Sequence, residues 1–230
     1  MAAEPTDQDE IFTDASELSE NDLFKLSLEL TKLPKEELDS IRKIIGVAPT
    51  EDIDISSLDP KTLNRIRMYM RHSVIRWKNL QFVVMDTPKN KSMNAYVQIC
   101  KHYNVTTVCC LTRPEYSKQK FEENGIDLHV LEFQDGSSPP SVVVKQWLKL
   151  VKAEFGSKTT NEEPTSAIGV HCAAGLGRAP VLVAVALVEY GLDALKAVEL
   201  IREKRRGAIN QRQLHYLRKY EPDDNSCTIS

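Results

Sequence analysis

A short glycine-containing loop between two apolar segments restricts the fold of this chain more than any other feature of its sequence. Residues 167–170 have the composition of a buried β-strand, and residues 177–190 that of a helix with an apolar run from Ala179 to Val188. The loop between them reads His171-Cys172-Ala173-Ala174-Gly175-Leu176-Gly177-Arg178. In a strand–loop–helix arrangement of this kind, backbone amides converge on one point and can bind an anion.

The cysteine and the arginine of this loop suit nucleophilic chemistry on phosphate. Loop amides and a helix N-terminus stabilise the thiolate of Cys172, which is the form that attacks. Gly175 and Gly177 permit positive φ angles and a close approach of the backbone to phosphate oxygens. Arg178 can bind two of these oxygens and stabilise transition-state charge. The alternative is that Cys172 is an unreactive core residue. The predicted phosphate-binding residues are Ala173, Ala174, Gly175, Leu176, Gly177 and Arg178, with His171 and Ala179 in support.

The reaction also needs an acid for the leaving oxygen, and the segment 132–136 offers one. It joins a predicted strand to a predicted helix, where a carboxylate can move toward the site. Asp135 would protonate the departing oxygen and then activate water against the phosphocysteine. The alternative is that Asp135 has only a structural role, as an aspartate that precedes glycine in a turn. Glu132 is a weaker candidate because it belongs to the strand.

Strand-like and helix-like segments alternate from residue 73 onward. Hydrophobic residues make up 41% and charged residues 27% of the 230 residues, which argues for a buried core and against wholesale disorder. The predicted strands are 74–77 and 80–85, which form a hairpin, and 105–111, 126–133 and 167–170. The predicted helices are 92–103, 114–124, 141–155, 177–190, 193–205 and 210–220. This alternation predicts an α/β fold with a mainly parallel sheet flanked by helices.

A cysteine, five residues and an arginine resemble the signature of cysteine-dependent protein tyrosine phosphatases. Residues 170–184, 204–210 and 214–220 are similar to the phosphatases of regenerating liver (PRL), and the similarity spans residues 73–230. The resemblance implies a dual-specificity-type protein tyrosine phosphatase domain, in which Cys172, Arg178 and Asp135 have the roles argued above. It implies a phosphoprotein substrate carrying phosphotyrosine, with phosphoserine, phosphothreonine and phosphoinositides as further candidates.

Four positions decide how far this resemblance extends. Most tyrosine phosphatases place a serine or threonine after the loop arginine, where its hydroxyl helps the thiolate leave the phosphoenzyme. This chain has Ala179 there, and the PRL subfamily also has alanine. The resemblance therefore implies slow turnover. Thr112 aligns with the redox partner cysteine of the subfamily. Cys109 and Cys110 lie nearby, so a disulfide that shields Cys172 is left open.

A binding function is the second hypothesis. The PRL resemblance implies a pocket that docks onto CNNM-type magnesium-transport mediators. The presence of Cys172, Arg178 and Asp135 favours an enzyme. Ala179 implies slow turnover, so the docking hypothesis stays open.

The first third of the chain differs in charge from the rest. Residues 1–72 hold 9 basic and 16 acidic residues, a net charge of −7, and residues 73–230 hold 21 and 17, a net charge of +4. Residues 1–21 have few large apolar groups and are predicted to be disordered. Apolar residues spaced by three and four predict three helices that begin near Asp22, Pro34 and Asp59. The alternation over 51–55 predicts a short exposed strand.

Residues 22–72 resemble the extra-terminal (NET) domain of bromodomain BET proteins, on segments 26–34, 44–45, 51–55 and 58–63. The resemblance implies a peptide-binding domain whose acidic strand pairs with a segment of alternating basic and apolar residues. Asp52 and Asp54 would face lysine or arginine side chains, while Ile53 and Ile55 would face the apolar groove.

The last four residues, from Cys227 to Ser230, fit a prenylation box whose terminal serine favours farnesyl. A single prenyl group anchors weakly, so reversible residence at the cytoplasmic face of membranes is predicted, with a soluble cytoplasmic pool. Basic residues near the end could face anionic lipid or form a solvated surface; they are Arg202, Lys204, Arg205, Arg206, Arg212, Arg218 and Lys219.

The predicted domains are therefore an acidic tail (1–21), a NET-like domain (22–72), a phosphatase domain (73–222) and a lipidated tail (223–230). The N-terminus has no secretory signal, the longest apolar run is about half a membrane span, and free thiols are expected. No metal, cofactor or nucleic-acid partner is predicted.

Overall fold

The computed structural model describes residues 23, 26–28, 30–33, 35–46, 48, 52–59, 62, 63, 66, 70–157 and 159–222. The predicted tail over 1–21 and the lipidation site at Cys227 lie outside the described residues, so both stay predictions. The chain divides into two compact units, residues 1–71 with 91–96 and residues 72–90 with 97–230. The division after Arg71 falls one residue from the predicted domain boundary.

The first unit contains α2 (Lys35–Ile45), the second of the predicted helices. This helix buries Ile41 and is followed by Gly46 at a φ of +76°, which glycine adopts without strain. Asp59 caps the next helical residues as expected, because its carboxylate accepts a hydrogen bond from Thr62 N at 3.0 Å. The buried apolar residues described between residues 1 and 71 are Leu26, Leu30, Ile41, Ile55, Leu63 and Ile66.

The strand predicted over 51–55 is wrong for the described residues. Residues 52–54 have no regular structure, and Ile55–Ser57 form a 3₁₀ turn, η2. Asp54 caps this turn by accepting hydrogen bonds from Ser56 N at 3.0 Å and Ser56 Oγ at 2.6 Å. Such local capping by aspartate competes with strand pairing. The peptide-binding role of Asp52, Ile53, Asp54 and Ile55 stays a prediction.

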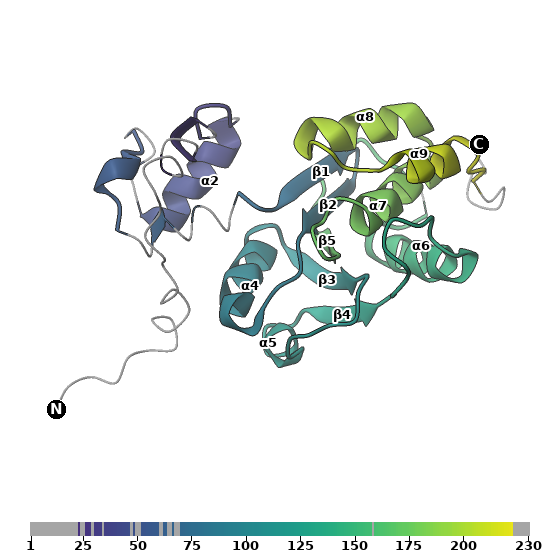
Figure 1. The fold of residues 1–230 in the computed structure, drawn as a ribbon, viewed down its shortest axis with the longest axis horizontal. Helices are drawn as coiled ribbons and strands as arrows, with labels where there is room; N and C mark the ends of the chain where they lie inside the picture. The colour runs from purple at the N-terminus through teal and green to yellow at the C-terminus, as the bar shows by residue number, and fades with distance from the viewer. Residues whose placement is uncertain are drawn as a thin grey trace. The chain divides into compact units, whose positions relative to one another are not determined.

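A five-stranded sheet in the order β1-β2-β5-β3-β4 organises the second unit (Figure 1). The predicted antiparallel hairpin is formed by β1 (Ser73–Trp77) and β2 (Leu80–Met85). The strands β3 (Val105–Cys110), β4 (Asp127–Val130) and β5 (Ala167–His171) run parallel to their neighbours, and β2 pairs with β5 in parallel. The predicted mainly parallel sheet is thus confirmed, with β5 at its centre.

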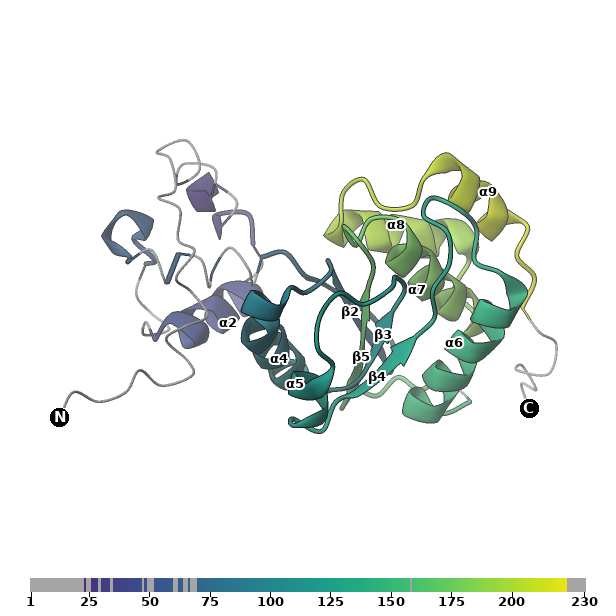
Figure 2. The same ribbon diagram turned by 60° about the horizontal axis from the view of Figure 1, so that its bottom comes forward.

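Helices cover both faces of this sheet (Figure 1 and Figure 2). One face carries α6 (Ser141–Phe155), α7 (Arg178–Glu189), α8 (Ala194–Lys204) and α9 (Gln211–Arg218). The other carries α5 (Gln119–Glu122) and residues 97–102 of α4 (Met93–His102), which follows the short η3 (Asn90–Ser92). The alternation in the sequence therefore predicted the layers correctly.

Most elements end within about two residues of the predicted bounds, and two are much shorter than predicted. The helix expected over 114–124 forms only as α5, because Tyr116 turns inward and Ser117 N donates to Asn90 Oδ1 at 3.0 Å. The strand expected over 126–133 ends at Val130, which pairs with the last residue of β3. Beyond Val130 the chain leaves the sheet and forms the loop that carries Asp135.

The core lies between the sheet and α7. Every residue of α7 is buried, and β2 and β5 are buried along their whole length, as expected for inner strands of a covered sheet. Trp147 of α6 contributes by packing on Phe82, with ring centroids 5.7 Å apart, and by donating to Leu182 O at 2.7 Å. This packing fixes α7, and with it the loop that precedes α7.

Within the described ranges, no helix is long and apolar enough to span a membrane. The same ranges contain no group of three or more His, Cys, Asp or Glu side chains placed to hold a metal ion.

Candidate active site

The loop 172–177 connects the C-terminal end of β5 to the first residue of α7. Because β5 is flanked by parallel strands on both sides, the loop lies at the carboxyl edge of the sheet, where α/β folds place their ligand sites. Cys172 is the first residue of this loop and is only 2% exposed. Ala179, in the first turn of α7, is fully buried and has no hydroxyl group to donate.

Thr87, which follows β2, holds the first two carbonyl groups of the loop. Its Oγ1 donates to Cys172 O at 2.7 Å, and its backbone N donates to Ala173 O at 3.1 Å. A single residue thereby fixes the orientation of two successive peptide groups.

Arg205 and Ile209 hold the next three carbonyl groups. Arg205, just after α8, donates from Nη2 to Ala174 O at 3.0 Å and from Nε to Gly175 O at 2.6 Å. Ile209 N donates to Leu176 O at 2.8 Å. Together with Thr87, these groups fix five consecutive carbonyls of the loop.

The fixed carbonyls leave the loop amides free for a ligand. In a planar trans peptide, N–H and C=O point in opposite directions, so the N–H groups of residues 173–177 point away from Thr87, Arg205 and Ile209. None of these five N–H groups donates a hydrogen bond in the part of the chain that the structure describes. Free neighbouring amides of this kind form an anion-binding nest.

Gly175 is required by the shape of this nest. Its φ is +68°, and a Cβ at this position would lie 2.6 Å from Met85 O and would also meet the Arg205 side chain. The positive φ predicted for Gly175 is confirmed, whereas the one predicted for Gly177 is wrong, since its φ is −115°. The predicted close approach to phosphate oxygens stays a prediction.

Arg178 is fixed in place before any phosphate binds. Its Nη1 donates to Leu111 O and Phe133 O, both at 3.2 Å, and the residue is 8% exposed. Its Nε lies 3.2 Å from Asp135 Oδ1, an ion-pair distance, without the alignment of a hydrogen bond. The Nε–H group is therefore still available to a phosphate oxygen.

Asp135 lies on a loop that α9 holds beside the phosphate loop. Asn210 Nδ2 donates to Gly136 O at 3.0 Å, and Gln213 Nε2 donates to Ser137 O at 3.1 Å. The Asp135 side chain is 72% exposed on this loop. A protonated carboxyl group in this position can reach both a bound ligand and solvent.

His171, the last residue of β5, directly precedes Cys172 and is fully buried. Its Nε2 forms a 2.7 Å hydrogen bond with Tyr116 Oη. Burial lowers the pKa of His171 to about 4 and raises the pKa of Tyr116 above its usual value. The imidazole is therefore neutral at neutral pH.

The other described cysteines are buried free thiols. Burial raises the pKa of Cys100 to about 12 and also raises the pKa of Cys109. Cys110 donates its S–H to Thr112 O at 3.0 Å. These thiols have the environment of packing residues, and no disulfide forms among them.

The structure places the predicted catalytic residues together: Cys172 and Arg178 bracket the loop, and Asp135 contacts Arg178. Glu132, the weaker acid candidate, is exposed on the segment that follows β4. Residues 52–55 belong to the first unit.

Sequence reasoning missed Thr87, Tyr116, Arg205 and Gln213, which hold the loops in place. Each lies tens of residues from the residue that it contacts, so local spacing carries no signal for it. Arg202 and Arg205 were expected to face lipid or solvent, and this expectation is wrong. Arg205 holds the phosphate loop, and Arg202 donates to Ala208 O at 3.0 Å and to Ile209 O at 2.8 Å.

Comparisons with known proteins agree with this geometry. Residues 73–226 match the family described as "Swiss Army Knife protein, DSP-PTPase phosphatase domain". The chain is 41% identical over 166 residues to the PRL-1 phosphatase of Drosophila melanogaster, covering 68% of this chain and 92% of that protein. It is 45% identical over 148 residues to the human protein tyrosine phosphatase type IVA 3, covering 64% of this chain and 83% of the relative.

A solved structure is similar as well. A protein tyrosine phosphatase from Leishmania major, 39% identical, superposes with a TM-score of 0.58 over 65% of this chain and 98% of its own. With the family match and the two relatives, this likeness shows that the chain belongs to the protein tyrosine phosphatases of the dual-specificity fold, in their PRL or type IVA branch.

Proposed function

We propose that this protein removes phosphate from phosphoproteins through a phosphocysteine formed on Cys172. The observation that carries the proposal is the set of five free loop amides next to a buried cysteine and an anchored Arg178. This set matches the three non-bridging oxygens and the developing charge of a phosphoryl group in transfer. The names of the relatives, as protein tyrosine phosphatases, support phosphotyrosine as the substrate group.

In the first step, the Cys172 thiolate attacks phosphorus while the bond from phosphorus to the substrate oxygen breaks. The loop amides and the guanidinium of Arg178 bind the phosphoryl oxygens throughout. Asp135, in its protonated form, donates a proton to the leaving oxygen, so that the product is a neutral hydroxyl group. The protein is left with a phosphocysteine and an Asp135 carboxylate.

In the second step, water attacks the phosphocysteine and the phosphorus–sulfur bond breaks. The Asp135 carboxylate accepts a proton from that water, and the products are inorganic phosphate and the Cys172 thiolate. A hydroxyl group at position 179 would help the thiolate leave, and the buried Ala179 has none. We therefore infer that the second step is slow and that the phosphocysteine persists.

The test is hydrolysis of a small aryl phosphate such as p-nitrophenyl phosphate by the full-length protein. Replacing Cys172→Ser exchanges a thiolate for a hydroxyl that stays protonated at neutral pH, so activity should disappear. The wild type, quenched in acid and digested, should give a phosphorylated peptide that contains Cys172. Undiminished activity of C172S would exclude the assignment.

The same slow step supports a second candidate function. A long-lived phosphocysteine keeps the pocket occupied and would act as a switch on docking, including docking onto CNNM-type magnesium-transport mediators, because a partner that enters the pocket can bind only while Cys172 is unmodified. A docking role predicts that a partner binds C172S as tightly as wild type and is released when the wild type carries phosphocysteine. A catalytic role predicts that only phosphorylated partners are retained by C172S.

A further inference from the structure

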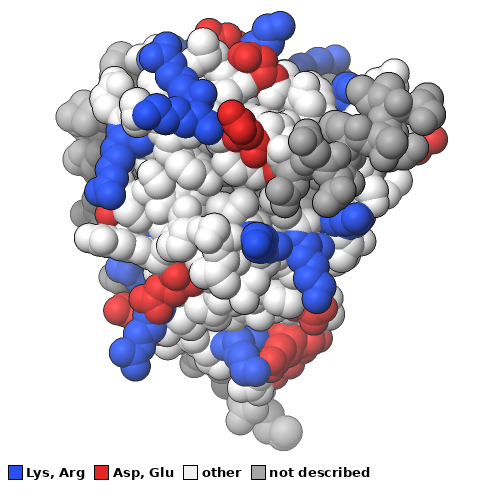
Figure 3. Space-filling view, turned by 90° about the vertical axis from the view of Figure 1, so that its right-hand side faces the viewer, with Lys and Arg blue, Asp and Glu red and all other residues white. Residues whose placement is uncertain are grey.

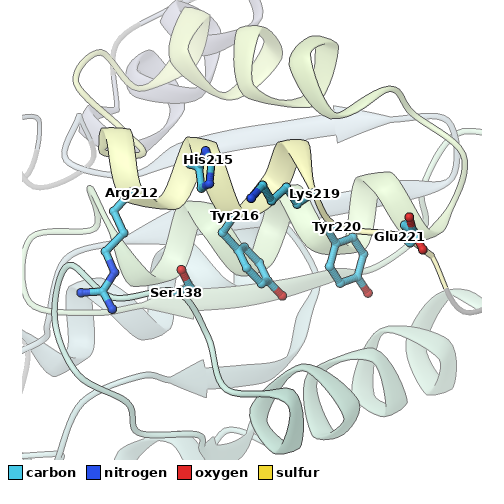
Figure 4. A pocket seen from close by; sticks show the side chains of 7 residues that line it. All are labelled: Ser138, Arg212, His215, Tyr216, Lys219, Tyr220 and Glu221. Carbon is cyan, nitrogen blue, oxygen red and sulfur yellow. The ribbon is translucent and has the colours of Figure 1, made fainter.

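A groove with a volume of about 410 Å³ runs along α9 and is not used by the proposed chemistry (Figure 4). One wall is α9 with the residues that follow it, and the other is Ser138, three residues beyond the predicted acid. Figure 4 places Arg212 and Ser138 at one end, Glu221 at the other, and Tyr216 and Tyr220 between them. We call this feature the α9 groove.

The two tyrosines give the α9 groove a fixed aromatic surface. Their ring centroids lie 5.8 Å apart at 48°, and both side chains are only partly exposed. The Tyr220 hydroxyl donates to the buried carboxylate of Glu189, the last residue of α7. Because this bond holds the ring, the apolar surface needs little ordering when a ligand binds.

Basic groups border this aromatic surface. Arg212, His215 and Lys219 line the α9 groove and are exposed. In the part of the chain that the structure describes, neither Arg212 nor Lys219 has an ion-pair partner. Figure 3, which shows the side of the molecule to the right in Figure 1, has charged side chains of both signs around a largely uncharged middle. The α9 groove therefore complements a segment that carries both acidic and apolar side chains.

The α9 groove lies next to the candidate active site in the fold. Gln213, next to Arg212 on α9, donates to Ser137 O at 3.1 Å, and its amide lies 3.5 Å from where a Cβ of Gly177 would be. Ser138 thus joins the groove wall to the loop of Asp135. A polypeptide that places its phosphorylated residue in the phosphate loop would pass over Ser138 onto α9.

We propose that the α9 groove binds the stretch of a phosphoprotein substrate that flanks the phosphorylated residue, and that it selects an acidic residue followed by an aromatic or large apolar one. This inference rests on the proposed function and adds the substrate class. Arg212 and Lys219 pair with the acidic side chain, and the rings of Tyr216 and Tyr220 contact the apolar one. Glu221, at the far end, disfavours further acidic residues there.

Two exposed charge pairs change affinity only moderately. Each contributes about 0.5 kcal/mol, so the acidic peptide should bind about fivefold more tightly than a neutral one. The difference should shrink as salt screens the pairs.

The experiment measures peptide binding to full-length C172S, which retains its ligand whether or not the wild type turns over. Two fluorescent phosphotyrosine peptides are compared, one with an Asp-Phe pair beside the phosphotyrosine and one with Asn-Phe, so that they differ only in the acidic side chain. The test variant is C172S with Arg212→Glu and Lys219→Glu. Its matched control is C172S with Lys145→Glu and Lys149→Glu, two exposed lysines on α6 with the same total change of charge.

The proposal expects the preference for the Asp-Phe peptide to vanish in R212E/K219E and to persist in K145E/K149E. It is overturned if C172S binds both peptides equally, if it binds neither, or if both double variants lose the preference alike. It is also overturned if R212E/K219E loses binding only to phosphatidylserine vesicles, which would assign these basic residues to a membrane. Hydrolysis of p-nitrophenyl phosphate by wild type reports separately on the proposed function, since that molecule cannot reach the α9 groove.

Discussion

Asp135 Oδ1 and Arg178 Nε lie 3.2 Å apart, so the predicted acid and the predicted phosphate ligand contact each other. One partner is largely exposed and the other is buried, with Nη1 already engaged by two carbonyls. A phosphate dianion at the loop competes with Asp135 for the guanidinium of Arg178. Binding of substrate should therefore release the Asp135 carboxyl group from Arg178, so that it can turn toward the leaving oxygen.

Replacing Asp135→Asn tests this role. The amide cannot donate to the leaving oxygen as an acid or accept a proton from water, so kcat should fall roughly 10²- to 10⁴-fold. Stopped-flow and steady-state kinetics on a phosphotyrosine peptide provide the measurement. The variant should still bind inorganic vanadate, because the loop amides and Arg178 are intact. A rate within a factor of two of wild type would transfer the role to another residue such as Glu132.

Arg205→Ala should weaken the phosphate loop. It removes two charge-assisted hydrogen bonds that fix the carbonyls of Ala174 and Gly175, each worth about 1.5–3 kcal/mol. We expect a loss of kcat/KM of about 10-fold or more, together with weaker inhibition by inorganic phosphate. Arg205→Lys, with one nitrogen in place of a fork, should recover only part of it. The matched control is Arg206→Ala, an exposed neighbour, which should behave as wild type.

Ala179→Ser should speed the second step. The added hydroxyl can donate to the departing sulfur, so the steady-state rate should rise while the initial burst of product stays similar. Rapid-quench measurement of phosphocysteine should show less of it at steady state than in wild type. Identical steady-state rates in the two proteins would mean that another step limits turnover.

His171 should make stability depend on pH. Its pKa is about 4 in the folded protein and about 6.5 when unfolded. The unfolded chain thus binds more protons between these values, so stability present above about pH 6.5 is lost as the pH falls toward 4. The shift corresponds to about 3 kcal/mol.

The measurement is the free energy of unfolding at pH 7 and pH 5 for wild type and for His171→Gln, whose amide can still bond to Tyr116. The free energy of unfolding should change less between pH 7 and pH 5 in the variant than in wild type, and the two changes should differ by a large part of this ~3 kcal/mol. Equal pH dependence in both proteins would show that His171 is already protonated, or solvated, in the fold.

The layers of the phosphatase unit could be predicted because their patterns are local. The apolar strands at 80–85 and 167–170 and the amphipathic helix at 141–155 each carry the periodicity of the element that they form. The helix predicted over 114–124 failed because a tertiary contact, the hydrogen bond from Tyr116 to His171, draws the chain inward. The strand over 51–55 failed because an aspartate in a turn can satisfy the backbone without a neighbouring strand.

Some residues of the candidate site could be predicted from local sequence spacing, and others could not. Cys172, Arg178 and the glycines lie within eight positions of one another, so their chemistry could be inferred from spacing. Arg205 lies on a helix end rich in basic residues, and nothing local distinguishes it from Arg206, which is exposed. Only the fold reveals which of the two arginines reaches the phosphate loop.

The hold of Arg205 and Ile209 on the phosphate loop has a consequence for biosynthesis. A nascent chain emerges from the ribosome N-terminus first, so Asp135, Cys172 and Arg178 all leave it before the residues that hold the carbonyls of Ala174, Gly175 and Leu176. A partly translated chain therefore has its full set of reactive groups while the loop amides of residues 175–177 are still unoriented. The phosphate loop is complete only when translation has delivered the segment around residues 205–213.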